Sequence, residues 1–247
     1  MTWRSAILRR INLGFASLGL ELRRNGNGKL PWDHIYERCV EEAKTQGRDP
    51  NDILDERWQG SPSTAWLERF ILPNFQKGDT VCEIGAGMGR YARHLVDDAG
   101  HLYLCDTSLY ACNLLGERFG GRDNVTIFRC NGNLLNAVPD NSVDLVFAIG
   151  VFMHLDAASI YNYLRESQRI LGAGGKAVFD YCSITTPSGV EFLKRNLPTN
   201  GQFSIFQYHH PLAMRSLVMD AGLGIKSEAV DQANGYPEKV IIELVKP

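Results

Sequence analysis

Glycine and acidic residues gather in one short segment of this sequence. The segment is Glu83-Ile84-Gly85-Ala86-Gly87-Met88-Gly89-Arg90, and it begins at the end of an apolar run, residues 80–84, that is typical of a buried strand. Glycine lets the backbone turn sharply and approach a ligand closely, because a side chain there would collide with it. The spacing is G-x-G-x-G, with Arg90 where a dinucleotide-binding turn has its third glycine. The segment therefore predicts a small-ligand site and disfavours a nicotinamide dinucleotide.

Polar residues also follow the next two apolar runs. Asp106 closes residues 101–105, where its carboxylate can accept both hydroxyl protons of a ribose. Asn131-Gly132-Asn133 follows residues 125–129. Open α/β sheets bind ligands at the carboxyl ends of their strands, so these groups are expected to share one site.

Strands and helices alternate strictly from residue 63 onward, which predicts a doubly wound α/β fold with a mostly parallel sheet. After residue 210 the pattern changes to a helix and two strands around a Gly-Tyr-Pro turn, which predicts an antiparallel C-terminal hairpin and seven strands in all. The expected strands are residues 80–84, 101–105, 125–129, 143–149, 176–181, 225–230 and 239–245, and the expected helices are 63–72, 91–98, 109–119, 158–171 and 211–221.

Composition limits the class of protein. The chain has 247 residues, 26 Lys and Arg against 28 Asp and Glu, and 44% hydrophobic residues, as in an ordinary globular protein. The near-neutral balance gives no general attraction to nucleic acid. Six cysteines without a CxxC pair or metal-ligand spacing are expected to be buried thiols in a reducing cytoplasm, and no metal site is predicted.

Two segments lie outside the alternating pattern, and both are expected to cover the substrate. Residues 1–62 are interpreted as an N-terminal helical lid, and residues 183–210 as a lid insertion within the domain formed by residues 63–247. Residues 1–30 are basic and amphipathic. They either pack over the domain, which we favour, or make a peripheral contact with an anionic membrane surface.

The ordered motifs resemble the class I S-adenosylmethionine-dependent methyltransferases over about residues 78–182. Besides the glycine segment and Asp106-Thr107, the resemblance rests on Gly150-Val151-Phe152-Met153-His154-Leu155 and on Leu171-Gly172-Ala173-Gly174-Gly175, which has Ala173 where the family has proline. It implies a Rossmann-like methyltransferase fold with S-adenosylmethionine as cofactor.

The resemblance also implies roles for individual residues. Glu83 would hold the amino group of the cofactor's methionine, Asp106 its ribose hydroxyls, and Asn131 its adenine amino group, with Asn133 as an equal alternative. The implied cofactor-binding residues are Glu83, Gly85, Ala86, Gly87, Asp106, Thr107, Asn131, Gly132, Asn133 and Ile149.

Methylation of a hydroxyl needs a base to remove its proton, and histidine has a suitable pKa. The candidates are His154, just past the fourth strand, and the adjacent pair His209 and His210. The aromatic and basic residues of the 183–210 insertion suit a small-molecule or saccharide acceptor. We therefore expect an O-methyltransferase, with an N-methyltransferase of a small metabolite or a non-catalytic cofactor-binding module as alternatives. The sequence predicts no oligomeric state.

Overall fold

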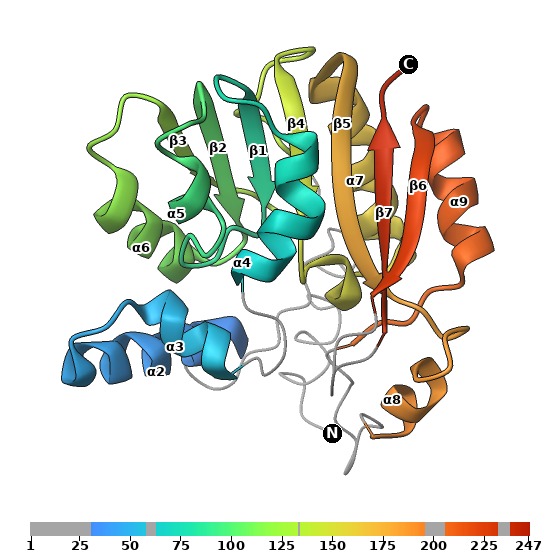
Figure 1. Cartoon of the computed structure of the whole chain (residues 1–247). Coiled ribbons are helices and arrows are strands. Elements are labelled where there is room, and N and C mark those ends of the chain that lie inside the picture. Colours follow the sequence, from blue (N-terminus) through green and yellow to red (C-terminus); the bar gives the residue numbers. More distant parts are fainter. Residues whose placement is uncertain (1–30, 58–62, 133, 196–205, 232–237) are drawn as a thin grey trace, which may run out of the picture.

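A seven-stranded sheet in the order β3-β2-β1-β4-β5-β7-β6 forms the centre of the protein (Figure 1). The computed structural model describes residues 31–57, 63–132, 134–195, 206–231 and 238–247. Strands β1 to β5 are parallel, and β7 runs antiparallel between β5 and β6. The predicted doubly wound sheet with its antiparallel hairpin is therefore confirmed. The strands are β1 (Thr80–Ile84), β2 (His101–Asp106), β3 (Val125–Arg129), β4 (Val143–Ala148), β5 (Leu171–Cys182), β6 (Gly224–Asp231) and β7 (Lys239–Val245).

Helices cover both faces of the sheet because successive strand residues point to opposite sides. Val81 packs into the cluster formed with α4 (Ser63–Trp66), α5 (Ala92–Leu95) and α6 (Leu109–Phe119). Cys82 packs into the cluster formed with α7 (Ala157–Ile170) and α9 (Pro211–Asp220). Both faces of the parallel strands are thereby buried, as a doubly wound fold requires.

Three predicted elements differ from the structure by more than one residue at a boundary. The helix expected over residues 91–98 is only α5, since the N–H groups of Asp98 and Ala99 both donate to Leu95 O and close the helix in a turn. The strand expected from residue 176 begins at Leu171, and a register shift absorbs the glycine turn. The helix expected over residues 63–72 is α4 followed by a π-helix, η1 (Leu67–Ile71), and a 3-10 turn, η2 (Leu72–Asn74).

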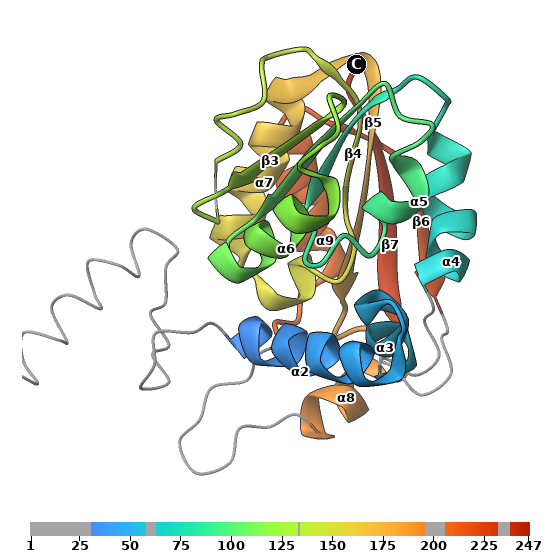
Figure 2. The same ribbon diagram turned by 90° about the vertical axis from the view of Figure 1, so that its left-hand side faces the viewer.

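Two helices that precede the sheet lie across the carboxyl ends of the parallel strands. They are α2 (Pro31–Gln46) and α3 (Pro50–Arg57), and Figures 1 and 2 show them as a layer below β1, β2 and β3. Helix α8 (Gly189–Arg195) lies at the same end of the sheet, below β6 and β7 in Figure 1. Residues 1–30, with the predicted basic helix and membrane contact, lie outside the described residues, as do residues 58–62 and 196–205. In the ranges that are described, no helix is long and apolar enough to span a bilayer.

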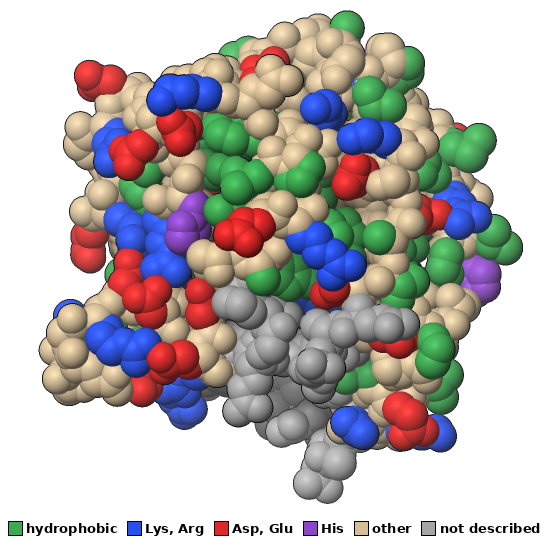
Figure 3. All heavy atoms as spheres, in the orientation of Figure 1, with side chains coloured by type: hydrophobic (Ala, Val, Ile, Leu, Met, Phe, Trp, Pro, Cys, Tyr) green, Lys and Arg blue, Asp and Glu red, His purple; other side chains and the backbone are tan. Residues whose placement is uncertain are grey.

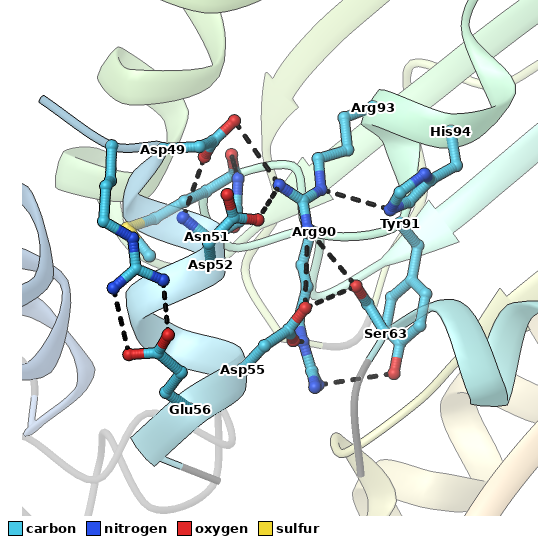
Figure 4. A network of polar contacts seen from close by, with 12 residues as sticks. Asp49, Asn51, Asp52, Asp55, Glu56, Ser63, Arg90, Tyr91, Arg93 and His94 are labelled. Carbon is cyan, nitrogen blue, oxygen red and sulfur yellow. Dashed lines mark hydrogen bonds and ion pairs between the residues drawn. The ribbon is translucent and has the colours of Figure 1, made fainter. Parts of the chain in front are cut away.

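Ion pairs hold α3 against the segment that follows the glycine turn. Arg93 donates to Asp52 at 2.7 Å and lies 3.4 Å from both Asp49 and Asp55, while Arg90 pairs with Asp55 (Figure 4). The outer charges of this cluster gather on the surface over α3 and α5, at the left of Figure 3. The side chains of Arg90 and Arg93 are each only 13% exposed, so these pairs are more shielded from water than ordinary surface salt bridges. We call Asp49, Asp52, Asp55, Arg90 and Arg93 the α3 network.

Candidate functional site

A cavity lies between the carboxyl ends of β1, β2 and β4 and the helix α2, which lies across those ends. Glycine-turn residues, two carboxylates, a histidine and several aromatic rings line it. The lining includes Trp32, Tyr36, Leu54, Trp66, Glu83, Gly85, Ala86, Gly87, Arg90, Tyr91, Asp106, Thr107, Gly132, Ile149, Gly150, His154 and Lys239.

Two glycines of the turn that line the cavity come so close to their neighbours that no side chain fits. Gly85 has a φ of 71°, and a Cβ there would lie 2.5 Å from a Val151 methyl group. Gly87 has a φ of 55°, and a Cβ there would lie 2.9 Å from the Tyr36 hydroxyl oxygen. Positive φ is strained for residues with a side chain, so both glycines are required by backbone shape as well as by space.

Asp106 lies at the end of β2 with both carboxylate oxygens held by backbone donors. Its Oδ2 accepts from the Gly87 N–H at 3.0 Å, and its Oδ1 accepts from the Ser108 N–H at 2.8 Å. Burial raises the pKa of Asp106, against the opposing effect of these donors. Each oxygen keeps a second lone pair for a ligand hydroxyl. The geometry thus fits a carboxylate that binds a diol.

Glu83 ends β1 nearby and is almost fully buried, with 3% of its surface exposed. Burial raises the pKa of Glu83 to about 8, and the nearby charge of Asp106 adds to the shift. Its Oε2 atom is buried without a hydrogen-bond partner among the described residues. A buried acceptor left in this state costs free energy that a cationic or N–H-bearing ligand group would recover.

Only some of the remaining predicted cofactor-binding residues line the cavity. Thr107, Gly132 and Ile149 line the cavity together with Ala86. Asn131 is not part of the lining, and its Oδ1 accepts from the Leu134 N–H at 2.9 Å. Asn133 lies outside the described residues. The assignment of an adenine-binding amide therefore stays a prediction.

His154 is brought into the cavity by the 3-10 turn η3 (Phe152–His154) that follows β4. Its ring centre lies 4.6 Å from that of Trp32, which begins α2, and 5.2 Å from that of Phe206, near the end of the 183–210 insertion. The Gln207 N–H donates to Met153 O at 2.7 Å and holds the insertion beside the turn. Both predicted lid segments therefore reach His154.

The other two predicted bases do not line the cavity. His209 Nε2 lies 3.0 Å from Leu155 O, and burial lowers the pKa of His209. His210 is exposed, and its Nδ1 caps α9 by accepting from the Leu212 N–H at 3.2 Å. Both rings therefore make local structural contacts. Of the three predicted bases, only His154 lines the cavity.

Sequence reasoning missed Tyr36, Leu54 and Lys239 as parts of the cavity wall. Tyr36 follows Trp32 by one helical turn, so a stripe at i and i+4 was a signal that α2 presents aromatic rings to one surface. Leu54 and Lys239 gave no such signal, because their places depend on how distant elements pack. In the described ranges, no group of three or more His, Cys, Asp or Glu side chains is arranged to hold a metal.

Comparison with known proteins agrees with this geometry. The family model of a methyltransferase domain matches residues 82–179, from β1 to β5. A phosphoethanolamine N-methyltransferase of Triticum aestivum is 29% identical over 113 residues, which are 44% of this chain. The chain covers only 22% of that relative's length.

Two solved structures share the fold. One is a chain of the complex between a methyltransferase activator of Haloferax volcanii and a methyltransferase, with a TM-score of 0.61, 18% identity, and coverage of 89% of this chain and 99% of that one. The other is the magnesium protoporphyrin IX methyltransferase of Synechocystis with bound S-adenosylhomocysteine, with a TM-score of 0.60, 16% identity, and coverage of 78% and 84%. Residues 82–179 therefore match the methyltransferase-domain family, and the sheet has the fold of the class I S-adenosylmethionine-dependent methyltransferases.

The residues present fit the cofactor of that family, S-adenosylmethionine. The unpartnered Glu83 oxygen suits an ammonium group, and Asp106 suits a ribose diol. The cradle at Gly85 and Gly87 leaves room that a Cβ would fill. When bound, this cofactor supplies an electrophilic methyl group on a sulfonium.

Proposed function

We propose that this chain transfers a methyl group from S-adenosylmethionine to an oxygen or nitrogen atom of a small-molecule acceptor. One observation carries the proposal: a single cavity joins the acidic residues Glu83 and Asp106 to His154. Methyl transfer is an in-line displacement, so the protein mainly has to align donor and acceptor and exclude water. Trp32 and Tyr36 of α2 and the insertion near Phe206 serve as covers in this proposal.

His154 acts as the base in this scheme. Its ring lies in the cavity between two aromatic rings that fix its orientation, and it accepts a proton from a hydroxyl or ammonium group of the acceptor. The name of the wheat relative supports amines among the acceptors, and the aromatic lining supports small organic molecules generally. Acceptors for the first screen are therefore sugars, small aromatic alcohols, ethanolamine and phosphoethanolamine.

Calorimetric titration with S-adenosylhomocysteine, with NAD as control, tests cofactor binding first. We expect saturable binding of S-adenosylhomocysteine alone. Binding of NAD alone would contradict the proposal. Transfer of labelled methyl groups to the acceptor panel then tests the reaction.

The role of His154 is tested with the acceptor that gives the highest rate. General-base catalysis contributes about a hundredfold to ten-thousandfold, so His154→Ala should lower kcat by about a hundredfold or more while S-adenosylhomocysteine binding is kept. His101→Ala is the matched control, because that histidine lies at the amino end of β2 beside Thr126, at the opposite edge of the sheet. Equal rates in the two variants would remove His154 as the base. Cofactor binding without transfer to any acceptor in the panel would favour the non-catalytic module instead.

A further inference from the structure

A buried lysine forms part of the cavity wall. Lys239 begins β7, is 6% exposed, and lines the cavity together with Trp66. Its Nζ atom lies 4.9 Å from the centre of the Trp66 ring and 2.9 Å from Asp180 Oδ2. Lysine is almost never buried without a partner, so this position combines a buried cation with access to a ligand cavity.

Asp180 lies behind the lysine and not in the cavity wall. It is fully buried, and its Oδ1 accepts from the Gly150 N–H at 2.6 Å. In the antiparallel register Lys239 stands opposite Cys182, which places Asp180 on the same face of the sheet two residues away. The cavity therefore meets the lysine end of this pair and not the carboxylate end.

The strand order separates this cation from the predicted cofactor residues. From Glu83 on β1 to Lys239 on β7 the sheet crosses three strand spacings, which is about 14 Å. Asp106 lies on β2, one strand further away on the other side of β1. A ligand group at Lys239 is thus separated from Asp106 by β1, β4 and β5.

We propose that Lys239 is a specificity-determining residue that binds an anionic oxygen group of the methyl acceptor, a carboxylate or a phosphate. This inference rests on the proposed function above. An ammonium group has three donors, and its ion pair with Asp180 leaves donors for a ligand in the cavity. Reciprocal bonds between Ser188 and Glu238 hold the start of β7: the Ser188 N–H donates to the Glu238 carboxylate at 3.3 Å, and the Glu238 N–H donates to Ser188 Oγ at 2.9 Å.

The test is calorimetric titration of the protein saturated with S-adenosylhomocysteine. Sodium phosphate and sodium acetate are the two probes, at an ionic strength kept constant with sodium chloride. We expect Lys239→Gln to weaken binding of the anion by about tenfold or more, because a charge-assisted hydrogen bond is lost. Asp180→Asn should tighten binding, because it leaves the ammonium group uncompensated. Lys226→Gln is the matched control, since that lysine also pairs with a carboxylate, Glu243, but is half exposed on β6.

The two opposite changes separate a ligand-binding lysine from a purely structural ion pair. A structural pair would respond to both substitutions in the same direction, and that result would overturn the proposal, as would absence of binding by either anion or an unchanged affinity in Lys239→Gln. Lys239→Arg keeps the charge and should keep binding, which controls for loss of folding. Failure of the wild-type protein to bind S-adenosylhomocysteine would contradict the proposed function, whereas the anion titration of the cofactor-free protein still tests Lys239. Preference for phosphate or for acetate identifies the anionic group.

Discussion

The buried carboxyl group of Glu83 makes stability and cofactor binding depend on pH in opposite ways. The pKa of Glu83 is raised from 4.5 to about 8, chiefly by burial. A carboxyl group whose pKa is raised in the folded protein destabilises the folded state when it is ionised. This free-energy cost appears as the pH rises above about 4.5 and stops growing above about 8. At pH 7 this difference corresponds to about 3 kcal/mol of folding free energy.

Glu83→Gln removes the ionisable group and keeps its shape. The free energy of unfolding of the variant should exceed that of the wild type by an amount that grows by about 1.4 kcal/mol per pH unit between pH 5 and 8. Denaturant unfolding at several pH values measures this slope. Glu191→Gln, at an exposed position on α8, is the control and should show no such growth.

Proton release on cofactor binding should also report the ionisation of Glu83. If the cofactor's ammonium group pairs with Glu83, binding at pH 7 releases about one proton in the wild type and about one fewer in Glu83→Gln. Calorimetry of S-adenosylhomocysteine binding in buffers of different ionisation enthalpy counts these protons. A stability difference that does not change with pH, together with equal proton release in the two proteins, would refute the assignment of Glu83.

Three further predictions concern the ribose carboxylate, the glycine turn and the α3 network. Asp106→Ala should weaken S-adenosylhomocysteine binding by about 2 kcal/mol, roughly thirtyfold, and an unchanged calorimetric affinity would remove the ribose assignment. Gly87→Ala should lower the free energy of unfolding by about 1–3 kcal/mol, because this position has a positive φ. Part of the loss should be recovered in combination with Tyr36→Phe, which removes the hydroxyl that the new Cβ would contact. Gly116→Ala, on α6 with open space around it, is the control in thermal unfolding. Arg93→Met should cost about 2 kcal/mol, because it removes the cation shared by Asp49, Asp52 and Asp55. A thermal midpoint equal to that of Lys77→Met, at an exposed pair, would contradict a structural role for the network.

The α3 network also has an expected response to acid. Burial alone would raise the pKa of Asp49, but its hydrogen bonds with Arg118 and the Asn51 N–H, together with the charge of Arg93, lower it to about 2. A lowered pKa means that the stabilising contribution of Asp49 is complete above about pH 4 and is lost as the pH falls toward 2. The attachment of α3 to the sheet domain should therefore loosen only in that acid range.

Much of the fold follows from local sequence patterns. The apolar runs of β1, β3 and β7 are short and bounded by polar or turn residues, so their limits in the structure equal those predicted. The glycine turn was recognisable because positive φ and close contacts leave few alternatives to glycine at Gly85 and Gly87. The start of β5 was not recognisable from the sequence, because Leu171 pairs with Val143 and extends the strand through a segment whose sequence is typical of a turn.

The parts of the site that sequence reasoning missed depend on contacts between distant residues. Lys239 meets Asp180 through an antiparallel pairing of β5 with β7, and no local period encodes that register. His209 and His154 have equal chemistry as bases, yet one ring bonds to Leu155 O and the other faces the cavity. Residue types in the sequence therefore identify candidate bases, and the packing of the folded chain determines which of them lies in the cavity.

The arrangement of charged side chains along the cavity gives a physical reason for where the methyl donor and the acceptor are proposed to bind. Glu83 and Asp106 place acidic groups at one end, and Lys239 places a cation about 14 Å from β1 across the sheet. In the two proposals above, the positively charged methyl donor binds at the acidic end and the anionic acceptor at the basic end. Transfer of the methyl group converts the sulfonium to a neutral thioether, so the attraction of the acidic end for the donor falls once the reaction is complete. His154, the proposed base, contacts Trp32 of α2 and Phe206 of the insertion, so it lies beside both proposed covers.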